Sequence, residues 1–220
     1  MKVVYVKDGK ITKNPKDASW LIAIKLVNGH FERNDYTMNG PLKRVKTFKD
    51  SLQNILDGNY YEYNNSGKLQ MSGKYRDHKK AGVWYQYNDS GNVVKKESFE
   101  IDPAASQNPN EESKQFYGNQ EINYKPSEFK GGNKELRNHI FHNFNVDIAS
   151  PKLKDEQAKI GFTIDSSGSV KNLHIVQSAN FAFDQEALRI ISIMPKWEPA
   201  SVNGKPVPSL HVQSITMFDY

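Results

Sequence analysis

The chain has 220 residues, which is enough for one large domain or for two small ones that each bury a core. Hydrophobic residues account for 37% of the sequence and charged residues for 25%, a composition typical of globular proteins. Cysteine is absent, which excludes disulfides, thiolate metal sites and cysteine nucleophiles.

The net charge of +5 is distributed unevenly along the chain. Residues 1–100 hold 18 Lys and Arg against 11 Asp and Glu, whereas residues 101–220 hold 12 against 14. A basic first half can attract nucleic acid or an anionic membrane surface. Here the lysines are scattered between acidic residues, as on an ordinary solvated β-surface, so we expect no nucleic-acid partner.

The first hundred residues carry an internal repeat. Gly40, Gly67 and Gly91 follow Asn or Ser in turn-forming pairs, and an aromatic residue stands eight positions after each glycine. The glycines are 27 and 24 residues apart, a spacing that indicates a repeated supersecondary unit. Each unit is expected to be a β-hairpin that stacks on its neighbours because it cannot bury its aromatic face alone. Residues 1–101 are therefore predicted to form an antiparallel β-hairpin repeat domain.

These repeats resemble the MORN-variant repeats of YwqK-type proteins, which are called antitoxins by association. The resemblance covers roughly residues 20–100 and rests on the pattern Gly-x-Trp/Tyr-x-x-Tyr-x-x-x-Gly-x-Val/Leu. Aromatic rings first serve packing, because each buries a large apolar area, and packing is the favoured interpretation. The alternative is a surface that binds a peptide, glycan or lipid. Its rings would be Tyr61, Tyr63, Trp84, Tyr85 and Tyr87.

Residues 102–122 are rich in Pro, Asn, Ser and acidic residues without apolar periodicity, and are predicted to be a linker. The remaining residues, 123–220, predict the order helix, strand, strand, helix, strand. Asn133 is expected to cap the first helix and Asp184 the second, because their side chains can accept hydrogen bonds from free amides. Pro195 is expected to end the second helix near Met194.

The chain after this helix predicts a tight turn and a final strand. Asn203 and Gly204 can both adopt positive φ, as a two-residue hairpin turn requires. In the final strand, Leu210 and Val212 share one face, whereas the apolar residues after Gln213 have the opposite parity. This change of phase predicts a β-bulge at Gln213 and Ser214.

Few residues are equipped for catalysis. His139 and His142 share a face of the first predicted helix but lack a third ligand, so no metal site is expected. There is no phosphate-binding loop, nucleophile elbow or paired-carboxylate motif, and we expect neither a cofactor nor enzyme activity. On the final strand, His211 is expected to point to the other face from Leu210 and Val212. Contact with a partner and simple exposure to solvent are both possible roles for it.

Three spaced motifs carry a second resemblance. They are Phe129-x-Gly131-Gly132, then Phe162-x-Ile164-Asp165-x-x-Gly168-x-Val170, and the run from Ala187-Leu188-Arg189 through Pro195 to Val207. Over roughly residues 125–220 the chain thereby resembles the C-terminal domain of TonB, in the form common in Bacteroidetes-type energy transducers. The resemblance implies an α+β chain, in which the MORN-like domain precedes a TonB-like α-β-β-α-β domain with a three-stranded antiparallel sheet.

The TonB resemblance also implies a function in TonB-dependent transport across the outer membrane. The domain would bind the TonB box of outer-membrane receptors by β-strand addition. An ExbB/ExbD-type motor would be a further partner if the native protein has an anchor. The edge strand that binds the partner would comprise Ser209, Leu210, His211, Val212, Gln213, Ser214, Ile215 and Thr216.

The same resemblance implies a periplasmic or cell-envelope location. The sequence shows no segment of the ~20 apolar residues that span a bilayer, so we expect an exported domain separated from its signal or anchor. Two alternatives stay open. One is a non-transducing periplasmic scaffold that dimerises through the same edge. The other is a MORN-like surface binder of anionic lipid or glycan through Lys79, Lys80, Lys95 and Lys96.

Overall fold

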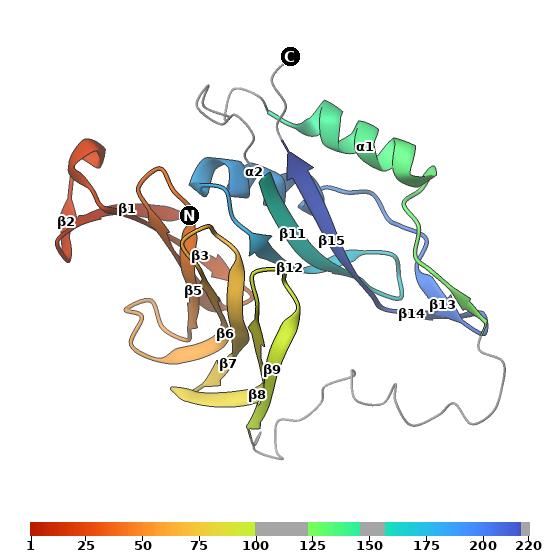
Figure 1. Ribbon diagram of the computed structural model, residues 1–220, viewed down its shortest axis with the longest axis horizontal. Helices are drawn as coiled ribbons and strands as arrows, with labels where there is room; N and C mark the ends of the chain where they lie inside the picture. Colours follow the sequence, from red (N-terminus) through yellow and green to blue (C-terminus); the bar gives the residue numbers. More distant parts are fainter. Residues whose placement is uncertain (100–122, 146–156, 217–220) are drawn as a thin grey trace. The chain divides into compact units, whose positions relative to one another are not determined.

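The computed structural model describes residues 1–99, 123–145 and 157–216 of the chain. It divides into two compact units, Met1–Asp102 with Gln177–Phe181, and Pro103–Val176 with Ala182–Tyr220 (Figure 1). The predicted linker over 102–122 lies outside the described residues, so the predicted domain boundaries stay predictions.

The first unit contains one antiparallel sheet of nine strands in the order β2-β1-β3-β4-β5-β6-β7-β8-β9. From β3 onward each strand pairs with the next one along the chain, which confirms the predicted hairpin architecture. The strands β1 and β2 were not predicted, and a short 3-10 helix, η1, follows them. The bounds are β1 Lys2–Lys7, β2 Lys10–Thr12, η1 Pro15–Asp17, β3 Trp20–Val27, β4 His30–Thr37, β5 Leu42–Phe48, β6 Leu56–Tyr63, β7 Leu69–Arg76, β8 Lys79–Tyr87 and β9 Val93–Phe99.

The repeat is visible in the turns that connect these strands. The amides of Gly67 and Gly91 donate to the carbonyls three residues earlier, at 3.1 and 2.9 Å. In both turns the side chain of the asparagine at that earlier position, Asn64 or Asn88, accepts further backbone hydrogen bonds at 3.0 Å. A register shift stands just before each of three equivalent turns, between Asp35 and Tyr36, Glu62 and Tyr63, and Gln86 and Tyr87.

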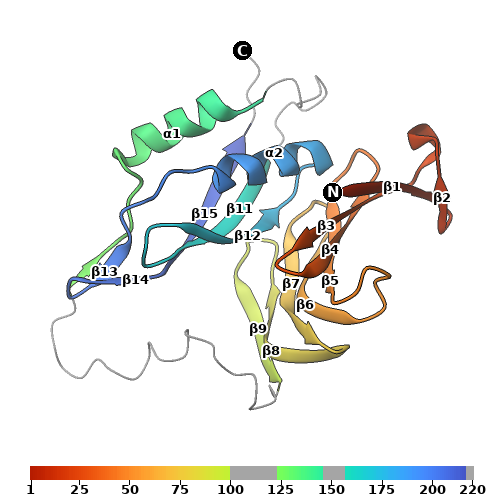
Figure 2. The same cartoon turned by 180° about the vertical axis from the view of Figure 1, so that it is seen from behind.

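The described residues of the second unit form two three-stranded sheets, one of them with much shorter strands, and two helices. The main sheet has the order β12-β11-β15, and the smaller one has the order β10-β13-β14. Figure 2 shows β11 between its two neighbours. The order helix, strand, strand, helix, strand is confirmed, with β10, β13 and β14 as additions. The bounds are β10 Tyr124–Lys125, α1 Gly132–Asn143, β11 Gln157–Ile164, β12 Val170–Gln177, α2 Phe181–Ser192, β13 Ala200–Val202, β14 Lys205–Val207 and β15 Ser209–Thr216.

The core of this unit is built from alternating residues of β11 and one stripe of α2. In a strand successive side chains point to opposite faces, so every second residue of β11 can enter the core. On α2 the buried residues recur at helical spacing. The buried side chains are Ala158, Ile160, Phe162 and Ile164 on β11, and Phe183, Ala187, Ile190 and Ile191 on α2.

Both predicted helix caps are wrong. The N-cap of α1 is Gly131, whose φ of 88° lies in the left-handed region that favours glycine, so Asn133 falls inside the first turn. The helix α2 begins at Phe181, and Asp184 is a buried residue within its first turn. The end of α2 at Ser192, before Pro195, agrees with the predicted stop to within two residues.

The predicted hairpin turn is confirmed. Asn203 and Gly204 have φ values of 51° and 79° and connect β13 to β14. The chain reverses direction at this turn before it continues through β14 to β15.

Candidate functional site

The last described strand, β15, is an edge strand of the main sheet of the second unit. It pairs antiparallel with β11 over its whole length, from Gln157 opposite Thr216 to Ile164 opposite Ser209. Among the described residues no strand pairs with its other side. A strand in this position offers a row of amides and carbonyls to another extended chain. Its bounds coincide with the predicted edge segment, whose role as a binding site stays a prediction.

The predicted bulge at Gln213 and Ser214 is wrong, because the pairing of β15 with β11 has no register shift. The change of phase has another cause. Leu210 and Val212 point to the open face of the sheet and are 84% and 60% exposed, whereas Ile215 points to the core. The apolar residues of β15 therefore divide between its two faces, without a slip in pairing.

His211 points to the inner face of the sheet, toward the aromatic core. Its ring stacks on Phe162 at a centroid distance of 5.4 Å and lies 4.9 Å from the ring of Trp197. Its Nε2 forms hydrogen bonds with the hydroxyls of Ser127, at 2.6 Å, and Ser209, at 3.2 Å. Burial lowers the pKa of His211, which favours the neutral imidazole at neutral pH. His211 is thus half-buried and held in place, instead of freely exposed.

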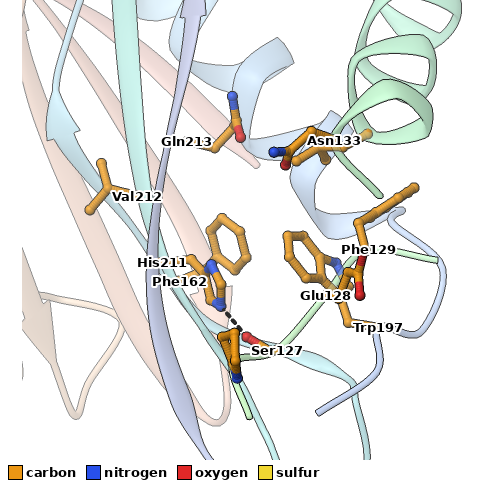
Figure 3. Close-up of a pocket in the computed structure, with 11 residues that line it drawn as sticks. Ser127, Glu128, Phe129, Asn133, Phe162, Trp197, His211, Val212 and Gln213 are labelled. Carbon is orange, nitrogen blue, oxygen red and sulfur yellow. Dashed lines mark hydrogen bonds between the residues drawn. The ribbon is translucent and has the colours of Figure 1, made fainter. Parts of the chain in front are cut away.

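A pocket of about 480 Å³ opens beside β15 on this inner face. Figure 3 shows His211 and Phe162 on one wall, Trp197 and Phe129 on the opposite wall, and Gln213 and Asn133 at one end. Its volume falls within the range of ligand-binding pockets. The lining residues are Pro126, Ser127, Glu128, Phe129, Asn133, Leu136, Phe162, Trp197, His211, Val212 and Gln213.

Most of these lining residues were not predicted as site residues. Three of them, His211, Val212 and Gln213, belong to the predicted edge strand. The others come from the segment before α1, from α1 itself, from β11 and from the segment after α2. Trp197 lies within the run from Ala187 to Val207 that carries the TonB resemblance, but it was not predicted as a site residue. No spacing in the sequence brings Phe129 and Trp197 together, although their rings lie 5.3 Å apart.

The contact between Ser127 and His211 has the atoms of a serine–histidine pair but lacks the arrangement that activates a nucleophile. In such sites a third group orients the imidazole through its other nitrogen. Among the hydrogen bonds of the described residues, none involves Nδ1 of His211. His139 and His142 also contact backbone carbonyls, of Ile190 at 3.3 Å and of Asn138 at 2.8 Å. The described part of the chain has no cluster of three or more metal-ligating side chains.

The five rings of the hypothetical aromatic surface do not share one environment. Trp84 and Tyr63 are buried, at 3% and 4% exposure, so they contribute no open ring to a surface. Tyr61, Tyr85 and Tyr87 are partly exposed.

The four lysines proposed for lipid or glycan binding are also partly engaged within the protein. Lys80 Nζ lies 4.4 Å from the ring centre of Trp84 and 5.2 Å from that of Phe99. Lys95 forms an ion pair of 2.9 Å with Glu97. These contacts do not favour a dedicated anion-binding surface.

A buried carboxylate joins the end of α1 to α2. Glu186 accepts hydrogen bonds from Arg189 Nε at 2.7 Å and from the backbone amide of Asn145 at 2.8 Å. Arg189 also donates to the carbonyl of Asn143. The hydrogen bond from Arg189 holds the pKa of Glu186 below its usual value. Both residues therefore have a local structural role, which is to hold the C-terminal end of α1 against α2.

Comparison with known proteins gives one match. Residues 154–218 match the family model described as the Gram-negative bacterial TonB protein C-terminal. No curated protein and no solved structure matches the chain. In the described ranges, no helix is long and apolar enough to cross a membrane. The matched segment contains β11, β12 and β15, which form the main sheet, together with α2, β13 and β14. Residues 154–218 of this chain are thus similar to the C-terminal domain of the Gram-negative TonB protein.

Proposed function

We propose that the second unit binds an extended segment of an outer-membrane receptor, the TonB box, by adding it as a strand beside β15. The TonB C-terminal family is a family of protein-interaction domains of the cell envelope, which supports a receptor as the partner. The observation that carries the proposal is the unbroken eight-residue strand, Ser209–Thr216, with one side unpaired in the described structure.

The geometry of β15 explains how such a segment would be held. Backbone hydrogen bonds along the free side of the strand supply affinity, and alternate side chains supply specificity. Leu210 and Val212 add an exposed apolar strip on the open face. An incoming strand would cover this strip with its own outward side chains, which removes apolar area from water.

The role of the peptide can be tested by titrating the full chain with TonB-box peptides of outer-membrane receptors from the same bacterium. N-methylation removes one backbone donor at a time. Strand addition requires that methylation at every second position weakens binding by about two- to tenfold, since only alternate amides face β15. Equal effects at all positions would contradict strand addition. Calorimetry measures the affinities, and backbone amide NMR locates the shifts on residues 209–216.

The protein side can be tested with two proline variants at neighbouring positions, Val212→Pro and Gln213→Pro. Their amides point to opposite sides of β15, so one serves β11 and the other faces the free side. We expect one variant to keep the NMR dispersion of the sheet while it loses peptide binding. If both variants fold and both bind the peptide with unchanged affinity, the proposal is wrong.

The same edge also fits the alternative of a scaffold that dimerises. In that case the mass in sedimentation equilibrium would rise with concentration, and the folded proline variant would stay monomeric. An ExbB/ExbD-type motor stays a prediction for the native protein.

A further inference from the structure

We infer that the pocket beside β15 receives one aromatic side chain with a polar edge, Tyr or Trp, from the incoming strand. The inference rests on the proposed function, because strand addition is what brings that side chain to the pocket. The inference adds the class of residue that the partner must carry and the place of that residue opposite β15.

The position follows from the parity of β15. His211 and Gln213 point to the inner face and line the pocket, whereas Leu210 and Ser214 point to the open face. Residues that stand directly opposite each other in neighbouring strands point to the same face of a sheet. A partner residue opposite His211 or Gln213 would therefore direct its side chain into the pocket, and the residues on either side of it would not.

The chemistry of the walls favours a ring. Phe162 and Phe129 lie 5.9 and 5.3 Å from the ring of Trp197, in edge-to-face geometry. His211 closes the group at 4.9 Å from Trp197. Aromatic rings attract one another in such offset or edge-to-face arrangements beyond the gain from buried area. A partner ring can continue this cluster, and an aliphatic side chain cannot make the same contacts.

The polar groups at the pocket favour a ring with a hydrogen-bonding edge. The side chains of Asn133 and Gln213 stand at one end of the pocket and Ser127 stands at the other, whereas Glu128 lies beside Trp197 and Phe129 (Figure 3). Burial of a polar group costs little where such partners surround it. Tyr and Trp each combine a large apolar body with a single polar edge.

The ring preference is tested with the full chain and a host heptapeptide of alternating threonine and valine. The central residue is Tyr, Phe, Leu or Ala. We expect Tyr to bind about tenfold or more tighter than Ala, and Leu to lie closer to Ala than to Phe. The indole N–H signal of Trp197 should shift with the Tyr peptide and stay in place with the Ala peptide. Equal affinities for all four peptides would overturn the inference.

A matched pair of variants tests the pocket itself. Gln213→Trp puts a ring into the pocket from the protein's own chain. Ser214→Trp puts the same ring one residue further along β15, on the open face of the sheet. We expect Gln213→Trp to abolish the preference for Tyr over Ala, and Ser214→Trp to keep it. If both variants keep the preference, the ring binds elsewhere and the inference fails.

Failure of the proposed function would look different. If the N-methyl scan shows strand addition while all four central residues bind equally, the proposed function stands and the pocket inference is wrong. If no peptide binds, strand addition is wrong. N-acetyltyrosinamide at millimolar concentration then decides the pocket separately. Shifts at Trp197 that Gln213→Trp removes would support a ring-binding pocket, and their absence would overturn it.

Discussion

The molecule contains two clusters of aromatic rings around a buried tryptophan, one in each unit. Trp84 lies 5.5 Å from Tyr60, 5.0 Å from Tyr75 and 6.4 Å from Phe99, measured between ring centres. Its indole Nε1 donates to the carbonyl of Lys74 at 3.1 Å. Trp197 is also buried, at 7% exposure, but its ring borders an open pocket. Its Nε1 has no hydrogen-bond partner among the described residues.

This difference distinguishes a cluster that serves packing from one that serves binding, which the number of rings alone does not. The Trp84 cluster fills its own space, satisfies its polar atom and carries Lys80 on its face, as a closed packing unit does. The Trp197 cluster leaves space beside an unpaired strand edge and a buried donor unsatisfied. Buried polar atoms without a hydrogen-bond partner are rare in native structures, and a partner in the pocket would account for this one. The C-terminal cluster is therefore the better candidate for a binding site.

The largest expected effect comes from removing either tryptophan. Trp84→Ala should lower the free energy of unfolding of the first unit by about 3–5 kcal/mol, because it leaves a large cavity in a filled cluster. Trp197→Ala should cost less, because one side of its ring already faces a pocket. Guanidinium unfolding, followed by NMR signals of each unit, measures both. An equal or larger loss for Trp197→Ala would show that the two clusters do not differ in packing.

The closed state of the Trp84 cluster can be tested by adding a single methyl group. A Cβ on Gly73 would lie 2.2 Å from the Trp84 ring, so Gly73→Ala should destabilise the first unit by about 1–3 kcal/mol through overpacking. Gly91→Ala is the control, since its added Cβ meets no atom within 4 Å. The control still carries the strain of a positive φ, which sets the baseline. A smaller loss for Gly73→Ala than for Gly91→Ala would indicate that the ring can move aside.

The contrast between the clusters also explains what the sequence could predict. The hairpin strands from β3 to β9, the Asn203 turn and the stop before Pro195 follow from local chemistry and were predicted, whereas β1 and β2 were not. Phe129, Phe162 and Trp197 meet only after the chain has folded, so no local pattern marks their pocket. The bulge was predicted wrongly because apolar residues were assumed to face the core, whereas Leu210 and Val212 are exposed.

Both helix caps fail for a related reason. Sequence preference for Asn and Asp at N-caps is local, and the backbone conformation or tertiary packing can override it. Gly131 occupies the N-cap of α1 because the chain turns there with a φ of 88°, and a Cβ would lie 2.5 Å from Glu135. Asp184 is fully buried within α2, where tertiary packing overrides its capping preference. Parity along a strand was more reliable, since it placed His211 opposite Leu210 and Val212 correctly.

A smaller effect is expected from the carboxylate that holds the C-terminal end of α1 against α2. Glu186→Gln keeps the shape but loses the charge-assisted bonds from Arg189, which should cost about 1–3 kcal/mol at neutral pH. Because its folded-state pKa is lowered, Glu186 stabilises the fold above its unfolded pKa, and this contribution is lost as pH falls through the folded pKa. Urea unfolding of both proteins across the acidic range should show the difference shrinking. A constant difference would assign the loss to packing.

The smallest expected effect concerns His211, which lies in the open cluster and has no counterpart beside Trp84. Burial lowers its pKa below the ordinary value of 6.5, so the unfolded chain binds a proton more readily than the folded chain. The second unit should therefore lose stability as pH falls below about 6.5, down to the lowered folded-state pKa. Protonation should also weaken binding of the Tyr peptide, because a charged ring is poorly accommodated between Phe162 and Trp197. His211→Phe retains a ring there without a titrating group, and should flatten both pH dependences. If the variant keeps the slopes of the native chain, His211 does not carry the pH dependence.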